Sequence, residues 1–133
     1  MNAMLHITLP QWHQLAKARD SAALARLVAD DAVFFSPVVH TPQRGKPLVV
    51  AYLSAALEVF TNGSFRYVRE LVAGNEAVLE FEVEIDGVAV NGVDMIRCDD
   101  AGSIVEFKVM IRPLKAINLI HQKMGEMLQR KQA

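Results

Sequence analysis

The feature that most constrains the fold of this chain is a strictly alternating run that ends in a tight turn. From Ala77 to Ile85 every second residue is apolar, and three glutamates stand between them. This period of two predicts a β-strand with one buried face and one charged face. Asp86-Gly87 follows at once and is typical of a two-residue hairpin turn. We therefore expect residues 88–98 to return as the antiparallel partner strand.

The rest of the chain predicts three more strands and four helices. Strands are expected at residues 33–36, 65–73 and 103–112, with a loop at 38–44. Helices are expected at residues 10–19, from the Asp20-Ser21 cap past Val28 to Asp30-Asp31, from Gly45 to Phe60, and from Leu114 to about Arg130. The order α-α-β-α-β-β-β-β-α predicts an α+β fold, with helices packed on one side of a curved antiparallel sheet.

Composition excludes several classes of partner and location. The 133 residues include 14 Lys+Arg and 15 Asp+Glu, a net charge of −1 that argues against nucleic acid or an anionic membrane as a partner. The longest apolar-rich stretch is shorter than the ~20 residues that span a bilayer, and no signal-peptide pattern is visible. The single cysteine, Cys98, predicts no disulfide and no zinc site. We expect one cytoplasmic domain over residues 1–133, without a metal or cofactor.

Apolar residues are more frequent than usual, which needs a structural explanation. They make up 52% of the chain without counting glycine, whereas globular proteins reach roughly 45–50% with glycine included. Either an apolar cavity or a buried subunit interface would accommodate this excess.

Four stretches of the sequence resemble one family. They are Leu27-Val28-Ala29-Asp30-Asp31-Ala32-Val33-Phe34, Gly45, residues 93–104 and Arg112-Pro113. Together with the element order they resemble the nuclear transport factor 2-like superfamily, in particular its SnoaL-like branch and the ketosteroid isomerases. The resemblance covers nearly the whole chain and implies a cone-shaped half-barrel, with a pocket between the concave sheet face and the helices. Members include isomerases, dehydratases, epoxide hydrolases, cyclases and non-catalytic binding modules, so the fold alone implies no single activity.

Three positions carry the comparison with the ketosteroid isomerases. Asp94 matches a pocket aspartic acid that stays protonated there and donates a hydrogen bond to the substrate oxyanion. Ser36 stands where those enzymes have the proton-abstracting aspartate, and Trp12 stands where they have a tyrosine. Serine is not a base near neutral pH, and an indole N–H donates without titrating. The resemblance therefore implies that this chain is not a ketosteroid isomerase.

Strand alternation, with the family register for the last strand, predicts a pocket wall in which Asp94 is the one strong polar group. The apolar wall comprises Trp12, Phe34, Leu53, Phe60, Leu79, Phe81, Val90, Ile96, Phe107, Val109 and Ile111. Desolvation by such a wall raises the pKa of an aspartate, which suits a general acid or hydrogen-bond donor. The alternative is a structural carboxylate, bonded to Trp12 or to a helix-end backbone group.

Three further side chains are candidates for the site. His40 lies in the loop that rims the pocket in this fold and is the predicted base, although such a loop histidine is often only solvated. Tyr52 and Ser36 are predicted to offer hydroxyls to a ligand. The indole of Trp12 needs a partner, either Asp94 or a ligand oxygen. The remaining histidines, His6, His13 and His121, are assigned to the surface.

On the opposite sheet face, apolar and charged residues are mixed. Val93, Met95 and Met110 lie there among Glu82, Glu84, Lys108 and Arg112. The row formed by Glu80, Glu82 and Glu84 is expected to pair with Lys108, Arg97 and Arg112, across the sheet or across a dimer. Such a face predicts a homodimer, in keeping with the family resemblance.

Three functions remain open from the sequence. The first is a cofactor-independent isomerase, lyase (dehydratase), cyclase or hydrolase acting on an apolar, oxygen-bearing metabolite, with Asp94 as acid or hydrogen-bond donor and His40 or a water as base. The second is a non-catalytic domain whose pocket binds a hydrophobic small molecule. The third is a dimerising module with a filled core. An open pocket of roughly 300 Å³ or more would exclude the third.

Overall fold

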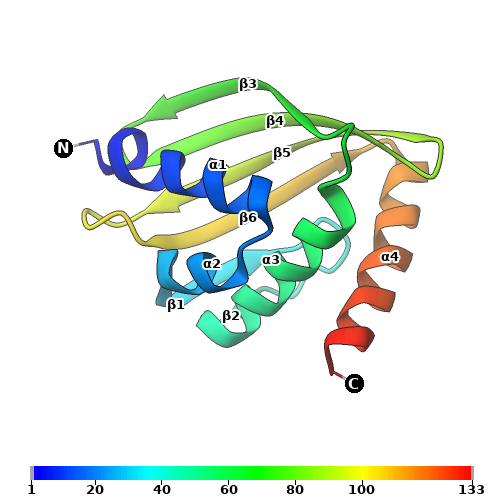
Figure 1. The fold of residues 1–133 in the computed structure, drawn as a ribbon, viewed down its shortest axis with the longest axis horizontal. Coiled ribbons are helices and arrows are strands. Elements are labelled where there is room, and N and C mark those ends of the chain that lie inside the picture. Colours follow the sequence, from blue (N-terminus) through cyan, green and yellow to red (C-terminus); the bar gives the residue numbers. More distant parts are fainter. Residues whose placement is uncertain (1, 133) are drawn as a thin grey trace.

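The computed structural model describes residues 2–132 and arranges them as one six-stranded sheet with helices against it. In chain order its elements are the π-helical turn η1 (Met4–Thr8), α1 (Leu9–Ala18), α2 (Ser21–Leu27), β1 (Val28–Phe35), β2 (Gln43–Arg44), α3 (Lys46–Phe60), β3 (Arg66–Ala73), β4 (Glu76–Ile85), β5 (Val88–Cys98), β6 (Ile104–Arg112) and α4 (Leu114–Gln132). Figure 1 shows the helices gathered on one side of the strongly curved sheet, which confirms the predicted α+β half-barrel.

The sheet is antiparallel except for one pair of neighbouring strands. Its order is β2-β1-β6-β5-β4-β3. β1 pairs with β6 in parallel, whereas every other pair is antiparallel. The sequence did not predict the parallel pair, because β1 and β6 are far apart along the chain and their relative direction depends on the path of all the elements between them rather than on any local pattern.

The hairpin of β4 and β5 forms as the alternation predicts. Its turn places Asp86 and Gly87 at φ 51° and 79°, the left-handed conformations that this turn type needs. Leu79 faces Asp94 across the two strands, and Asp94 also faces Val109 of β6. These side chains therefore lie on the concave face, which is buried under the helices.

The second helix is shorter than predicted, and the strand after it begins earlier. α2 ends at Leu27, and Val28 adopts an extended backbone while its N–H still bonds to Leu24 O. Val28 then pairs with Ile104 of β6, before an irregularity in the register that ends at Val33. The β-branched side chain of Val28 fits a strand as well as a helix face, and its pairing with β6 decides between them.

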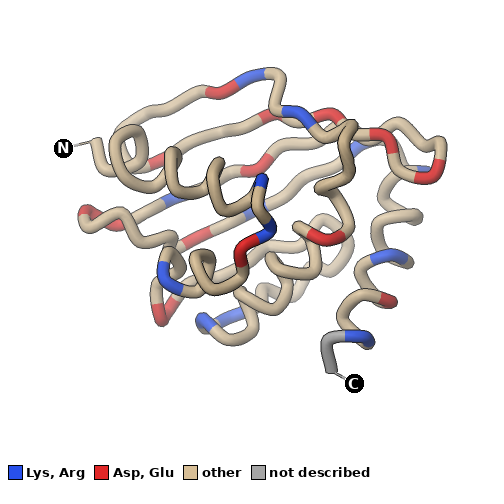
Figure 2. The backbone as a smooth tube through the Cα atoms, viewed as in Figure 1, with Lys and Arg blue, Asp and Glu red and all other residues tan. Residues whose placement is uncertain are grey.

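Charged residues on the convex face pair along β3 and β4. Arg66 lies 2.7 Å from Glu82 and Arg69 lies 3.4 Å from Glu80, joining side-chain nitrogen and oxygen atoms. Within the chain, Glu80 and Glu82 therefore pair with arginines of β3 and not with the predicted Lys108, Arg97 and Arg112, whereas pairing across a dimer stays a prediction. The strands beside β4 are β3 and β5, so Lys108 and Arg112 of β6 stand two strands away, and Arg97 pairs with Glu106 instead. Figure 2 shows these charges spread along the sheet.

Among residues 2–132, no helix is both long and apolar enough to cross a membrane.

Candidate active site

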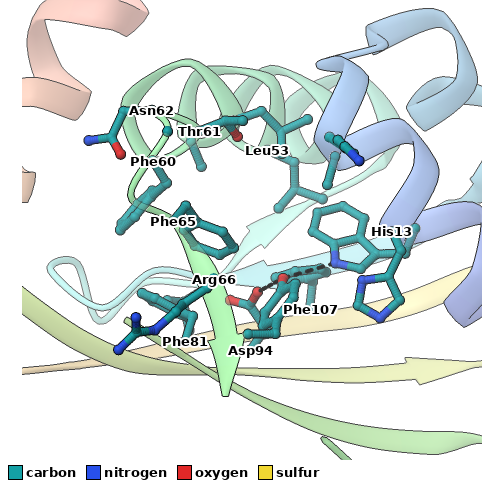
Figure 3. Close-up of a pocket in the computed structure, with 18 residues that line it drawn as sticks. His13, Leu53, Phe60, Thr61, Asn62, Phe65, Arg66, Phe81, Asp94 and Phe107 are labelled. Atoms are coloured by element: carbon teal, nitrogen blue, oxygen red, sulfur yellow. Dashed lines mark hydrogen bonds between the residues drawn. The ribbon is translucent and has the colours of Figure 1, made fainter. Parts of the chain in front are cut away.

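A cavity of about 460 Å³ lies between the concave sheet face, α1 and the end of α3. Its wall is mainly apolar and aromatic, as the close-up in Figure 3 shows. The wall residues are Trp12 and Ala16 of α1; Leu53, Ala56, Leu57 and Phe60 of α3; Phe65, just before β3; Tyr67 of β3; Phe81 of β4; and Phe107 and Val109 of β6. Small-molecule sites typically enclose about 300–1,000 Å³, so this cavity is large enough for a ligand. The third functional alternative, a fully filled core, does not fit it.

Gly92 of β5 makes room for the aromatic part of the wall. A Cβ atom there would lie 2.6 Å from the Phe81 ring and 2.5 Å from the carbonyl oxygen of Met110. The ring of Phe81 packs over this gap and stacks on Phe65 at a centroid distance of 5.3 Å. Phe60 meets the same ring edge-on at 5.5 Å. The missing side chain at position 92 is therefore what lets Phe81 lie against the sheet.

A chain of hydrogen bonds crosses the floor of the cavity. The indole Nε1–H of Trp12 donates to the Tyr67 hydroxyl at 3.0 Å. That hydroxyl donates to Oδ2 of Asp94 at 2.5 Å, and both bonds are dashed in Figure 3. The indole of Trp12 was predicted to bond to Asp94 or to a ligand. Instead, Tyr67 lies between Trp12 and Asp94, and its hydroxyl oxygen accepts the hydrogen bond from the indole N–H.

Asp94 is buried, with 7% of its surface exposed, and lies on the cavity floor. Burial raises the pKa of its carboxyl group from 3.8 to about 7, and the hydrogen bond from Tyr67 offsets part of this rise. Burial, with the nearby Asp94 next in importance, raises the pKa of Tyr67 well above 10. The phenol therefore stays protonated at neutral pH, while the carboxyl group changes charge there.

The number of protons on Tyr67 and Asp94 determines what the pair offers to a ligand. When Asp94 is neutral the pair carries two protons: one is used between the two residues, and the other is free for an oxygen in the cavity. When Asp94 is ionised, the single remaining proton is used within the pair. The other carboxyl oxygen of Asp94, Oδ1, makes no hydrogen bond within the described residues. Every fully buried side-chain oxygen of these residues has a hydrogen-bond partner, so Oδ1 must keep some solvent-accessible surface. The pair thus donates below its transition and accepts above it.

His13 lies at the edge of the same cavity, although the sequence assigned it to the surface. Its Nε2 contacts the carboxylate of Glu70 on β3, and its ring meets Tyr67 edge-on at 5.3 Å. With Nε2–H directed at that carboxylate, Nδ1 is the nitrogen that can accept a proton in the neutral ring. Its side chain is 37% exposed, so the surface assignment holds only in part.

Comparison with known proteins agrees with this architecture. A family model described as the SnoaL-like domain matches residues 10–107. The chain belongs to the SnoaL-like family. Its fold is also that of solved nuclear transport factor 2-like proteins, which confirms the resemblance inferred from the sequence.

Solved structures give the SnoaL-like chain several relatives. A steroid delta-isomerase from Pseudomonas aeruginosa is 42% identical, with a TM-score of 0.80 over 93% of this chain and 88% of that one. An uncharacterised protein with a cystatin-like fold from Silicibacter pomeroyi is 28% identical, with a TM-score of 0.83 over 91% and 84%. A protein of unknown function from Mesorhizobium loti is 26% identical, with a TM-score of 0.69 over 80% and 88%. No curated protein matches the sequence.

The cavity of this SnoaL-like chain brings together seven of the side chains predicted from the sequence, namely Trp12, Leu53, Phe60, Phe81, Asp94, Phe107 and Val109. A smaller cavity of about 160 Å³ between the sheet, α3 and α4 is lined by others, including Phe34, Ser36 and Tyr52. Ala56, Phe60 and Val109 line both cavities, so these three side chains form part of the partition between them. Ile96 is buried in the core and lines neither cavity.

The predicted base, His40, does not lie at the main cavity. It lines a separate and more open groove of about 480 Å³ with Ser36, Lys108 and Ile111. The hydroxyl of Ser36 accepts a hydrogen bond from the Val38 N–H at 3.1 Å. Loop 38–44 follows β1, and β6 lies between β1 and the strand β5 that carries Asp94. A local sequence pattern does not fix this separation.

Tyr67 is the residue that the sequence analysis missed. Phe65 and Tyr67 alternate with charged Arg66, a signal that would place both rings inside. The alternation then fails, because the register of β3 against β4 shifts between Tyr67 and Arg69. That bulge leaves Val68 44% exposed and returns Glu70 to the inner side, opposite Leu79.

Within the described part of the chain, no group of three or more His, Cys, Asp or Glu side chains is arranged to hold a metal ion.

Proposed function

We propose that this cavity binds an apolar carbonyl compound and transfers a proton at the carbon next to its carbonyl group. The Tyr67–Asp94 pair at the floor carries the proposal, because its spare proton is available to a carbonyl oxygen near neutral pH. As the carbonyl becomes an enolate, its oxygen gains negative charge, and a donor aimed at it from an apolar wall stabilises that state. The similarity to a steroid delta-isomerase supports an apolar, oxygen-bearing ligand.

The proposed base is His13 rather than His40. It lines the same cavity as Asp94, and Glu70 orients its ring, as expected for a base held by a carboxylate. In the proposed cycle, Nδ1 of His13 takes the proton from the carbon while the floor pair hydrogen-bonds to the carbonyl oxygen. The same imidazolium then returns a proton to this carbon or to its vinylogous position. No atom is gained or lost, and no cofactor enters the balance.

A proton-exchange measurement tests this proposal without knowledge of the natural substrate. The probe is 2-tetralone, an apolar ketone of suitable size, dissolved in D₂O and followed by NMR. The protein is expected to accelerate exchange of the protons next to the carbonyl. Asp94→Leu is expected to lower this rate by about 10²–10³-fold, because it removes the donor to the oxyanion. His13→Gln is expected to lower it by roughly 10²-fold or more, through loss of the base.

Glu82→Gln is the matched control, since Glu82 is a carboxylate on the opposite face of the same hairpin. This variant is expected to exchange the protons of 2-tetralone as fast as the unaltered protein does. A protein that binds 2-tetralone, by line broadening, yet leaves its exchange at the buffer rate would favour the non-catalytic binding module. That alternative is supported by the small number of ionisable groups in the wall: His13, Lys17, Arg66, Tyr67 and Asp94.

We further propose that two copies associate through the convex face, as the sequence predicted. No described helix covers this face, and Met110 on it is 51% exposed. Its mixed apolar and charged surface supports a protein contact. Sedimentation at micromolar concentration is expected to give a dimer, and Met110→Glu a monomer. A monomeric unaltered protein would overturn this second proposal only.

A further inference from the structure

The mouth of the main cavity is positively charged, in contrast to its apolar wall. Lys17 near the end of α1 and Arg66 at the start of β3 both line the cavity, and both are exposed, so they lie where it meets solvent. Figure 2 shows the basic segments at the end of α1 and at the start of β3. Among the described lining residues the single acid is Asp94, and it is at the floor. Since the chain as a whole has a net charge of −1, this basic mouth is a local feature.

The neighbouring charges at the mouth are paired, with one exception. Arg66 pairs with Glu82, Arg19 with Glu58 at 3.5 Å, and His13 with Glu70. Lys17 forms no ion pair and no side-chain hydrogen bond within residues 2–132, so its ammonium group is left for a ligand or for water. It follows His13 by one helical turn on the cavity-lining side of α1, as expected for positions i and i+4.

The floor and the mouth of the cavity thus favour ligand groups of different charge. The floor pair suits an uncharged oxygen, because an anion there would face an apolar wall and the ionisable Asp94. The middle is lined by Leu53, Phe60 and Phe107, which offer nothing to a polar group. The mouth attracts negative charge in a region open to solvent, where pairing with Lys17 requires little desolvation.

We propose that the ligand of this cavity is amphipathic, with a carbonyl or hydroxyl oxygen at its inner end, an apolar body, and an anionic group such as a carboxylate at its outer end that pairs with Lys17. This inference rests on the proposed function for the inner end of the cavity. It adds the orientation of the ligand and restricts the substrate class to anionic apolar carbonyl compounds or their enols.

Two fluorescent probes that differ in a single group test the proposal. They are 6-hydroxy-2-naphthoate, whose hydroxyl and carboxylate stand at opposite ends, and its methyl ester, which is uncharged. Both are titrated at pH 6 and low salt. The carboxylate is expected to bind about fivefold tighter than the ester, the effect of one solvent-exposed ion pair. Lys17→Met is expected to remove most of this preference while leaving ester binding unchanged.

Lys115→Met provides the matched control, because Lys115 is an exposed lysine on α4 that does not line the cavity, and it is expected to keep the fivefold preference. High salt should reduce the preference of the unaltered protein as the Lys17 substitution does. Equal binding of the two probes, or a preference that survives Lys17→Met, would overturn the proposal.

Tyr67→Phe distinguishes failure of this inference from failure of the proposed function. Ester binding that weakens in Tyr67→Phe, together with equal affinities for both probes, would overturn the anionic outer end and leave the floor as proposed. Carboxylate binding that Lys17→Met weakens and Tyr67→Phe leaves unchanged would support the basic mouth alone. Failure of both probes to bind would count against both proposals, since both carry the apolar body and the inner hydroxyl, and the carboxylate probe also carries the anionic outer group.

Discussion

The two faces of the β4–β5 hairpin carry carboxylates with opposite environments. Asp94 faces inward, is 7% exposed, and receives a hydrogen bond from Tyr67, so its pKa rises to about 7. Glu82 faces outward, its side chain is 45% exposed, and it pairs with Arg66. Both belong to the same pair of strands. The comparison teaches that the side of the sheet, more than the kind of residue, decides whether a carboxyl group here is suited to proton transfer or to a surface ion pair.

The largest expected effect is on the pH dependence of stability. The pKa of Asp94 is about 7 in the folded state and 3.8 in the reference state, so the unfolded chain binds fewer protons between these values. The contribution of Asp94 to stability is therefore greatest below about pH 4, falls as pH rises to about 7, and then levels off. About three pH units at about 1.4 kcal/mol each give roughly 4 kcal/mol. Asp94→Asn should remove this decline in urea unfolding measured from pH 4 to pH 8.

Glu82→Gln is the outward-facing control for that series and should leave the slope as it is. An Asp94→Asn variant whose stability falls with pH as steeply as that of the unaltered protein would contradict the buried, titrating Asp94.

Core packing should show the next largest difference between the faces. Leu79 of β4 points inward and is fully buried, whereas the preceding Val78 points outward and is partly exposed. Leu79→Ala is expected to cost about 2–5 kcal/mol, because it removes buried methyl groups and leaves a cavity. Val78→Ala should cost under about 1 kcal/mol. Similar losses for both, by chemical denaturation, would mean that the two faces are equally buried, as in a dimer that covers Val78.

A smaller loss of stability is expected from Gly92→Ala. The added Cβ would stand 2.5 Å from the carbonyl oxygen of Met110, a backbone atom that cannot rotate away. Overpacking of this kind costs about 1–3 kcal/mol, and displacement of Phe81 should also narrow the cavity. Gly63→Ala serves as the control, since a Cβ at Gly63 meets no atom within 4 Å. Equal losses of melting temperature in Gly92→Ala and Gly63→Ala would contradict the close approach at Gly92.

The smallest effect is expected at the outward-facing ion pair. Glu82→Gln removes the partner of Arg66, whose side chain is 70% exposed. Exposed ion pairs contribute about 0.2–1 kcal/mol, and salt screens them. Denaturation at low salt should detect this loss, and denaturation near 1 M salt should not. A loss as large as that of Leu79→Ala would show that the Glu82–Arg66 pair is buried in solution, as it would be if the proposed contact between two copies extended to β3 and β4.

Local patterns in the sequence were sufficient for the hairpin and for the inward face of its strands. The predicted return strand 88–98 is β5, Val88–Cys98, because the turn fixes the register and the alternation fixes the faces. Asp94 was singled out by the family resemblance, and the alternation of β5 then predicted which of its neighbours share its face; the raised pKa of Asp94 follows from the burial of its carboxyl group. The family resemblance, which the domain match over residues 10–107 confirms, supplied the relation of helices to sheet.

Local sequence patterns did not identify the residues that lie beside Asp94. Tyr67 precedes a bulge that breaks the alternation of β3, and His13 is brought to Tyr67 by the packing of α1 across the sheet. The prediction chose His40 because its loop rims the pocket in related folds, but here that loop lines a separate groove.

By itself, the sequence determined the β4–β5 hairpin, the inward face of its strands and most of the helices, because these follow from period and turn chemistry, whereas the family resemblance supplied the role of Asp94. Only the tertiary structure decided that Asp94 bonds to Tyr67, that His13 shares its cavity, and that Lys17 stands unpaired at the mouth. The Tyr67–Asp94 and Trp12–Tyr67 hydrogen bonds join residues 27 and 55 positions apart, and their geometry depends on how α1 and β3 pack against the sheet.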